Sequence, residues 1–332
     1  MSIQVIKPGA LSTLQDVGRV GYQRFGVTVG GVMDEWSHRI ANLLVGNDEN
    51  EATLEMTMQG PSLLFKSTQL IAICGADMSP TINKQPVPQR RPVLVKAGSQ
   101  LDFGLLRQGA RGYLAVAGGY RVQPVMHSKA TFIRGGFGGF EGRALQKMDE
   151  LEINPNEGEK RYPSLSKQLE QDNSGLVAPT WSVNTSTGEK TSPLKVRVVA
   201  GQQWQAFTEE AQANFAESTF QISTQSDRMG YRIEGTALAL RQPLELISEA
   251  VGFGTIQVPP DGNPIILMAD RQPTGGYPKI AQVASVDLPL LAQMLPKERL
   301  QFSMISLDDA QRLYFAREDE LALIRQAVEM HK

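Results

Sequence analysis

Short apolar runs bounded by turn residues recur along the whole chain and predict a protein built mainly from β-strands. The runs are IQVI at 3–6, LIAIC at 70–74, YLAVA at 113–117, KVRVV at 195–199, TIQV at 255–258 and IILM at 265–268. Gly, Pro, Asn or Asp lies at the ends of these runs, as expected where strands give way to turns. This rhythm favours barrels or packed sheets over alternating strands and helices.

A few helices are also predicted. DEWSHRIANLLVGN has Asp34 as a suitable N-cap, apolar residues at helical spacing and Gly46 as a stop signal. Shorter helices are predicted from Thr208 and from Asp287. A long helix is predicted from Ser306 to the end, because a Ser-x-x-Asp capping pattern there precedes helically spaced apolar residues.

The chain of 332 residues is long enough for two domains, and a polar, turn-rich segment places their boundary. Between 154 and 193 no apolar period is sustained. We therefore predict an N-terminal domain at 1–153, a polar linker or excursion at 154–193, a C-terminal domain at 194–305 and a terminal helix at 306–332. A short likeness between DVGRVGYQ and SDRMGYRI is weak support for two related halves.

Composition narrows the class of partner. The chain is 41% hydrophobic and 20% charged with a net charge of −2, so neither a nucleic-acid footprint nor a polybasic membrane anchor is expected. The sequence has no apolar run of about 18 residues and its start lacks the regions of a signal peptide. We therefore expect a cytoplasmic protein that uses neither nucleic acid nor membrane as a partner.

Several common catalytic motifs are missing from the sequence. The three histidines lack metal-ligand spacing, so no metal site is expected, and we interpret His38 as a surface or groove residue. The single Cys74 lies in an apolar run typical of a buried thiol. Neither a Gly-x-Ser-x-Gly elbow nor a Walker motif occurs, so a nucleotide site would be unconventional or belong to a partner.

Glycine-rich loops with polar residues carry the remaining candidate chemistry. In ADRQPTGGYPKI, at 269–280, an apolar run ends and polar side chains surround a Gly-Gly pair. Glycine lets backbone N–H groups approach a ligand, and arginine binds carboxylates with two hydrogen bonds. The loops therefore favour a small carboxylate or amide substrate, although glycines that only satisfy turn geometry are the alternative reading.

Long motifs in the same order resemble the biotin-dependent carboxyltransferase family in its subunit 2 form. They are TLQDVGRVGYQRFGVTVGGVMDEWSHRIANLLVGNDENEATLEMTMQGPSLLF, YLAVAGGYRVQPVMHSKATFIRGGFGGFEGRAL, QSDRMGYRIEG and GTIQVPPDGNPIILMADRQPTGGYPKIA. The resemblance runs from about residue 3 to 306 with one gap over the predicted linker. It implies two cyclophilin-like β-barrel domains.

The resemblance also implies an activity and partners. The family includes components of 5-oxoprolinase, in which partner subunits of the B and A types complete an ATP-dependent enzyme that opens 5-oxoproline to glutamate. ATP is then used together with the partner subunits, and no tightly bound cofactor is expected. Two alternatives remain open: a component that transfers a carboxyl group from carboxybiotin to a urea-like amide, and a regulator that binds a kinase-inhibitor-type partner.

Motif by motif, the resemblance implies a set of site residues. Substrate contacts fall at Gln15, Asp16, Arg19, Asp34, Glu55, Arg143, Gln225, Asp227, Tyr231, Gln257, Thr274, Gly275, Gly276 and Tyr277, and catalytic groups at Asp270, Arg228 and Gln272. Arg228 and Arg143 are expected to bind a carboxylate or phosphate. Asp270 is expected to act as a base or to orient other groups. In the alternative reading, SDRMGYR only fixes a barrel corner through an Asp-Arg pair.

Two departures from the family pattern affect the expected substrate. Pro273 stands where relatives more often have Thr, which removes a hydroxyl and a backbone N–H from the loop. The segment HSKAT, with His127 and Ala130, stands where relatives often have Gly-Ser-x-Ser-Thr.

Overall fold

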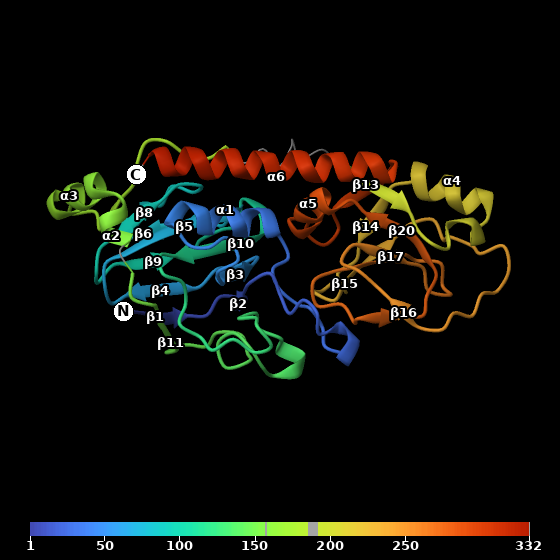
Figure 1. The fold of residues 1–332 in the computed structure, drawn as a ribbon, viewed down its shortest axis with the longest axis horizontal. Coiled ribbons are helices and arrows are strands. Elements are labelled where there is room, and N and C mark those ends of the chain that lie inside the picture. The colour runs from blue at the N-terminus through green and yellow to red at the C-terminus, as the bar shows by residue number, and fades with distance from the viewer. Residues whose placement is uncertain (157, 185–191, 332) are drawn as a thin grey trace. The chain divides into compact units, whose positions relative to one another are not determined.

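The computed structural model describes residues 1–156, 158–184 and 192–331, which form two compact units (Figure 1). The first unit lies within Met1–Gly18, Asp34–Thr185 and Leu321–Lys332. The second lies within Arg19–Met33 and Ser186–Glu320. An early segment of the chain, Arg19–Met33, therefore belongs to the same unit as the C-terminal half.

The first unit contains two six-stranded sheets. One has the order β11-β1-β4-β9-β6-β7 and the other the order β12-β8-β5-β10-β3-β2. Helix α1 packs on β5 and β10. The strands are β1 Ser2–Lys7, β2 Leu11–Gln15, β3 Thr53–Thr57, β4 Ser62–Phe65, β5 Gln69–Asp77, β6 Thr81–Ile82, β7 Gln85–Pro86, β8 Val93–Val95, β9 Gln100–Asp102, β10 Gln108–Val116, β11 Glu150–Glu152 and β12 Leu176–Val177.

Alternation along β2, β3 and β10 gives their sheet an apolar face and a polar face. Leu14, Leu54 and Leu114 belong to the buried apolar core of the unit. The intervening residues Thr13, Glu55 and Tyr113 oppose one another in register across the three strands, and they are buried as well. The polar face must therefore satisfy its own hydrogen bonds away from water.

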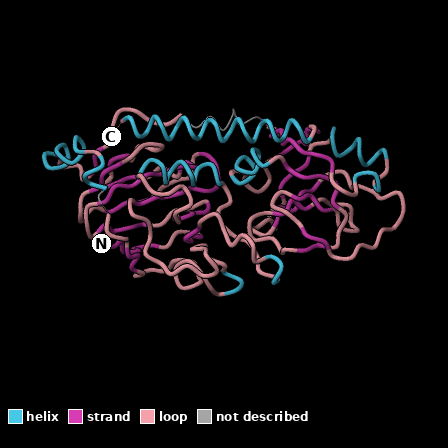
Figure 2. Tube along the Cα trace, in the orientation of Figure 1, coloured by secondary structure: helices cyan, strands magenta, loops and turns pink. Residues whose placement is uncertain are grey.

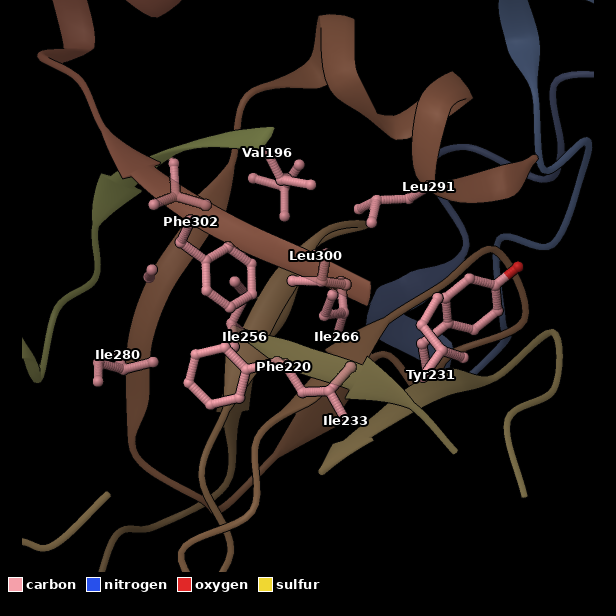
Figure 3. Close-up of a cluster of buried hydrophobic side chains, with 14 of the residues drawn as sticks. Val196, Phe220, Tyr231, Ile233, Ile256, Ile266, Ile280, Leu291, Leu300 and Phe302 are labelled. Atoms are coloured by element: carbon pink, nitrogen blue, oxygen red, sulfur yellow. The ribbon is translucent and has the colours of Figure 1, made fainter. Parts of the chain in front are cut away.

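The second unit contains a closed barrel in the order β13-β20-β17-β18-β15-β14-β21 and a separate ribbon of β16 and β19. Apolar side chains fill the barrel (Figure 3), and the rings of Phe215 and Phe302 stack with centroids 4.4 Å apart. The strands are β13 Leu194–Ala200, β14 Phe220–Ile222, β15 Gly230–Glu234, β16 Glu249–Ala250, β17 Thr255–Gln257, β18 Ile265–Leu267, β19 Thr274–Gly275, β20 Lys279–Val283 and β21 Arg299–Met304.

Side-chain caps mark the starts of α1 and α6, as their sequences predict. Helix α1, Glu35–Val45, starts after Asp34, whose carboxylate accepts from the Ser37 backbone N–H at 2.9 Å, and ends at Gly46. Ser306 Oγ accepts from the Asp309 N–H at 3.0 Å at the start of α6. The other helices are α2 Gly158–Arg161, α3 Pro163–Gln171, α4 Glu209–Glu217, α5 Leu288–Ala292 and α6 Leu307–Met330.

The prediction of a mainly β protein with a few helices and a C-terminal helix is confirmed, and strands and loops make up most of the trace (Figure 2). Each of the six apolar runs forms a strand. Within the described residues, we find no helix with the length and apolar character needed to cross a membrane.

The polar segment after residue 153 contains regular structure of its own. Helix α3 buries Leu165 and Leu169, one helical turn apart, and β12 pairs with β8. Two apolar residues among polar neighbours form too narrow a stripe to be read as a period, so this helix was not predicted. Residues 158–177 thereby add to the first unit.

Candidate functional site

Arg228 and Asp270 form a two-point ion pair in the second unit. Arg228 Nε donates to Asp270 Oδ2 at 2.9 Å, and Nη2 donates to Oδ1 at 3.0 Å. The side chains are 9% and 12% exposed, so the pair is largely shielded from water. Charge-assisted bonds of this fork geometry are strong and directional. The structure therefore brings together the two residues for which the sequence predicted the most specific catalytic roles.

The barrel topology explains this proximity. Strands β15 and β18 run antiparallel with Gly230 opposite Leu267, and Arg228 and Asp270 lie just beyond these two ends. The backbone continues the pairing, since the Asp270 N–H donates to the Arg228 carbonyl at 2.8 Å. Residues 42 positions apart in sequence are thus fixed side by side by strand register.

The Arg19–Met33 segment brings a second guanidinium to this pair. Arg19 is fully buried, and a Cβ placed on Gly30 would lie 3.7 Å from its Nη1 and 3.6 Å from Asp270 Oδ1. Arg228 Nη2 also donates to the Gly31 carbonyl at 2.5 Å. Two guanidinium groups and one carboxylate therefore surround a glycine turn, and we call Arg19, Gly30, Gly31, Arg228 and Asp270 the arginine cluster.

Arg271, next to the cluster, lies in an unusual environment for a guanidinium. Burial lowers its pKa to about 10, and the neighbouring Asp270 carboxylate acts in the opposite direction. Its side chain donates to the Met268 carbonyl at 3.4 Å and lies over the Phe253 ring at 5.7 Å. Arg271 therefore lies at the same barrel end as Asp270, and although it belongs to the ADRQPTGGYPKI motif it was not among the predicted site residues.

The Gly-Gly loop packs against the barrel wall through Gln257. Gln257 is 1% exposed, and its Nε2 donates to the Tyr277 carbonyl at 3.2 Å. A Cβ on Gly275 would lie only 2.5 Å from that amide nitrogen. Thr274 and Tyr277 are exposed, whereas Gly275 is buried. The structure thus brings together four predicted substrate contacts: Gln257, Thr274, Gly275 and Tyr277.

The other predicted site residues of the second unit lie in the barrel core, in a turn or in loops. Tyr231 is 2% exposed and belongs to the barrel core, so it is not placed to contact a substrate (Figure 3). Asp227 is exposed and accepts from the Met229 and Gly230 N–H groups, which stabilises the turn before β15. Gln225 is exposed and Gln272 half-buried, and Gly276 lies beside the carbonyl of Leu246.

In the first unit, Asp34, Glu55 and Tyr113 form one buried network. Tyr113 OH donates to Glu55 Oε2 at 2.8 Å and accepts from the Asp34 N–H at 2.8 Å. Burial, followed by the nearby Glu55 and Asp34 carboxylates, raises the pKa of the Tyr113 phenol well above its ordinary value. The neutral hydroxyl therefore serves as the donor to Glu55 and fixes its orientation.

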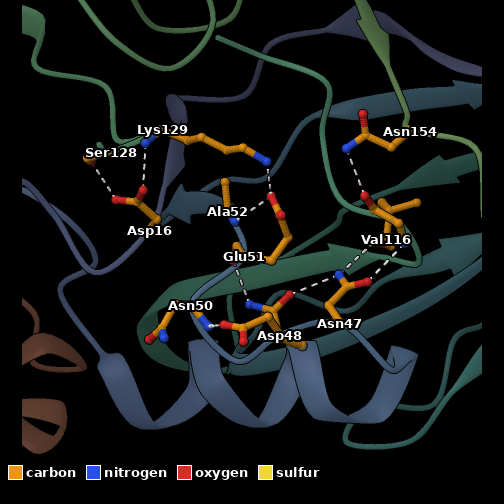
Figure 4. A network of polar contacts seen from close by, with 12 residues as sticks. Asp16, Asn47, Asp48, Asn50, Glu51, Ala52, Val116, Ser128, Lys129 and Asn154 are labelled. Carbon is orange, nitrogen blue, oxygen red and sulfur yellow. Dashed lines mark hydrogen bonds and ion pairs between the residues drawn. The ribbon is translucent and has the colours of Figure 1, made fainter. Parts of the chain in front are cut away.

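Gln15 and Asp16 are occupied by hydrogen bonds with the segment that departs from the family pattern, and Figure 4 shows those of Asp16. Asp16 accepts from Ser128 Oγ at 2.7 Å and from the Lys129 N–H at 2.6 Å. Gln15 Nε2 donates to the Thr131 carbonyl at 3.1 Å. Lys129 Nζ lies 2.5 Å from Glu51 Oε1. These contacts fix the HSKAT segment to the end of β2.

Arg143 is engaged by two carboxylates of its own loop. Its Nη1 and Nη2 donate to Asp149 at 2.7 and 2.9 Å, and Nη2 donates to Glu141 at 2.5 Å. The hydrogen bond with Arg143 is the main reason that the pKa of the Asp149 carboxyl lies below its ordinary value. These bonds tie Arg143 to the structure of its loop.

The interpretation of His38 as a surface or groove residue is wrong. His38 lies within α1 and is fully buried, and its Nδ1 lies 2.8 Å from Thr53 Oγ1. The apolar residues Trp36, Ile40 and Leu44 mark one face of the helix, and His38 was predicted to lie outside that face. In the structure the helix is buried around most of its circumference, so His38 is buried as well.

Burial of His38 predicts a pH-dependent stability. Burial, with a smaller contribution from Arg39, lowers the His38 pKa to about 3. In the unfolded chain, His38 takes up a proton as the pH falls through about 6.5, whereas in the folded chain it stays neutral at that pH. Stability is therefore full above this pH and falls as the pH drops toward 3, by up to about 1.4 kcal/mol per pH unit. Urea unfolding at about pH 7, 6 and 5 should show this slope.

The matched variant for this prediction is His38→Gln, which places a hydrogen-bonding amide near Thr53 but cannot titrate. We expect it to be less stable than the parent at neutral pH and to lose less stability on acidification. An unchanged slope in His38→Gln would assign the pH dependence to other groups.

A cavity of about 610 Å³ lies at the C-terminal end of α1, in the first unit. Its lining mixes both charges and includes Asp48, Glu51, Lys160 and Arg161. None of the predicted site residues lines it. Within the part of the chain that the structure describes, no group of three or more His, Cys, Asp or Glu side chains is arranged to hold a metal ion.

Comparison with known proteins agrees with the motifs. Residues 25–304 match the family model of the carboxyltransferase domain, subdomains A and B. The chain is 35% identical over 329 residues to the C subunit of 5-oxoprolinase from Haemophilus influenzae, covering 98% of this chain and 99% of the relative. It is 36% identical over 318 residues to the C subunit of 5-oxoprolinase from Escherichia coli, covering 96% and 95%.

A solved structure shows the same fold over nearly the whole chain. The crystal structure of the Kluyveromyces lactis urea amidolyase matches with a TM-score of 0.85 and 30% identity, covering 97% of this chain and 20% of that protein. The chain therefore belongs to the carboxyltransferase-domain family, subdomains A and B.

Proposed function

We propose that this chain is the C subunit of a 5-oxoprolinase and contributes a substrate site to that enzyme. The observation that carries the proposal is the match to two proteins of that name over nearly the full length of both chains. The match to urea amidolyase, by contrast, spans one-fifth of that protein. The arginine cluster supplies cationic groups for the negative charge that develops on oxygen during the reaction.

In this proposal, Arg19 and Arg228 bind the phosphoryl and lactam oxygens of the reacting species, and Asp270 orients Arg228. Both nitrogens of the Arg228 fork already contact Asp270, which favours an orienting role for this carboxylate over that of a base. The Gly275 and Gly276 backbone supplies donors beside Gln257, Gln272, Thr274 and Tyr277. Further contacts are proposed within the first unit for Gln15, Asp16, Asp34, Glu55 and Arg143, and separately within the second unit for Gln225 and Asp227.

The reaction explains why such groups are needed. A lactam is a poor electrophile, and phosphorylation of its carbonyl oxygen by ATP would make attack by water feasible. Guanidinium groups stabilise the charge that develops on oxygen during both steps. Because the chain lacks a Walker sequence, we propose that partner chains of the A and B types supply the nucleotide site.

The test is ATP-dependent release of glutamate from 5-oxoproline by this chain mixed with its A and B counterparts. We expect activity that disappears when any one of the three chains, or ATP, is omitted. A stable complex without this activity would contradict the proposal. Carboxyl transfer from carboxybiotin to urea by the same complex would then identify the alternative enzyme, and binding without either activity would identify a regulator.

A further inference from the structure

An exposed segment, residues 242–250, covers the Gly-Gly loop within the second unit, and we call it the flap. Almost every residue of the flap is exposed, and Ile247 is 91% exposed. Its end forms β16, which pairs with β19 so that Glu249 opposes Gly275 and Ala250 opposes Thr274. Gly276 lies beside the Leu246 carbonyl and Ser248 Oγ. The flap therefore lies directly on the proposed substrate contacts.

Lys279 lies beneath the flap as a buried cation. It is the first residue of β20, opposite Gln257 of β17, and its side chain is only 7% exposed. Gln203 holds its backbone, because the Lys279 N–H donates to Gln203 Oε1 at 3.0 Å and the Gln203 N–H donates to the Lys279 carbonyl at 3.2 Å. The barrel wall thus fixes the backbone from which the Lys279 side chain extends.

The ammonium of Lys279 contacts a carboxylate that comes from the flap. Lys279 Nζ lies 2.5 Å from Glu249 Oε2, and the Glu249 side chain is 46% exposed. A buried lysine requires an anionic partner, because an uncompensated ammonium away from water is costly. Here a buried cation is paired with a carboxylate on an exposed two-residue strand, beside Gln257 and Gly275.

We propose that Lys279 binds the carboxylate of the substrate, and that Glu249 occupies this position in the free chain. The inference rests on the proposed function, which supplies a substrate with a single carboxylate. The substrate carboxylate displaces the Glu249 side chain and forms the ion pair with Lys279 in its place. Once Glu249 has left Lys279, the flap that carries it moves away from the Gly-Gly loop. The contact with Glu249 reduces the fraction of chains ready to bind, and this fraction sets the apparent affinity.

Two variants of this pair should change substrate affinity in opposite directions. Glu249→Gln removes the internal competitor, so the KM for 5-oxoproline in the assembled complex should fall by about threefold or more. Lys279→Met removes the charge that binds the carboxylate, so KM should rise by about ten- to a hundredfold. Lys279→Arg should restore part of the affinity. Glu245→Gln, on the same flap, is the matched control and should leave KM unchanged.

A ligand pair tests the carboxylate directly. 5-Oxoproline and 2-pyrrolidinone share the lactam ring, but only the first carries a carboxylate. Calorimetric binding to the full chain, free and in the complex, should favour 5-oxoproline, and Lys279→Met should remove this preference. If Glu249→Gln weakens binding as Lys279→Met does, or if neither changes it, the inference is wrong.

These outcomes separate the inference from the proposed function. A complex that is active but shows no fall in KM for Glu249→Gln would retain the oxoprolinase function and overturn the role of Lys279. A complex that is inactive would contradict the proposed function. Even then, a preference for 5-oxoproline that depends on Lys279 would support the carboxylate site, and the lack of one would refute it.

Discussion

Replacing Asp270 by Ala is expected to lower the free energy of unfolding by about 3–5 kcal/mol, because it leaves buried guanidinium charge without its carboxylate. Arg228 is 9% exposed and donates twice to Asp270, and the fully buried Arg19 lies at the same glycine turn. We also expect kcat/KM of the assembled complex to fall by about a hundredfold, since Arg228 loses its orientation. Urea unfolding of the chain and glutamate release by the complex are the measurements.

The double variant Arg228→Met with Asp270→Leu separates stability from function. Replacing both members of a buried ion pair by apolar residues often restores much of the lost stability. We therefore expect the double variant to be more stable than Asp270→Ala and still inactive. Restored activity in the double variant would show that the pair only fixes a barrel corner.

Replacing Gly275 by Ala is expected to reduce kcat/KM by about a hundredfold, as displacements of about 1 Å at a site commonly do. The new Cβ would lie 2.5 Å from Gln257 Nε2, a separation that real structures do not tolerate. The loop or the buried amide must move, and with it the β16–β19 ribbon. Kinetics of the complex would measure the loss.

Gly276→Ala is the matched control for this prediction. The nearest atom to its new Cβ would be the Leu246 carbonyl oxygen at 3.4 Å, which is ordinary contact. We expect at most a severalfold change in kcat/KM. Equal losses in the two variants would contradict the packing argument and would indicate that the loop requires glycine at both positions for flexibility.

Local patterns predicted the elements of this fold, whereas pairing between distant residues had to be observed. Apolar runs and capping residues act over a few positions, which is why α1 and the barrel strands begin and end near their predicted residues. The order of strands in the closed barrel depends on contacts between residues far apart in sequence.

The site shows the same division. The family motifs indicated Arg228 and Asp270, and the register of β15 and β18 brought them together. Lys279 was missed, because a single lysine in YPKIAQV looks like an exposed residue of an alternating strand. Its burial depends on the flap, and Glu249 lies 30 positions earlier in the chain. The register of β17 and β20 shifts beside Lys279, so simple alternation along the strand did not indicate its side.

The assignment of Arg19–Met33 to the second unit bears on how the chain is made. A ribosome synthesises this segment before most of the first unit, yet Met33 belongs to the barrel core and Arg19 to the cluster with Asp270. At about 5–20 residues per second, Asp270 emerges on the order of ten seconds or more after Arg19. The barrel unit can therefore be completed only after both Arg19–Met33 and the C-terminal half have been synthesised. A gene fragment that starts at β13 would encode the barrel strands without Met33 of the barrel core and without Arg19 of the arginine cluster.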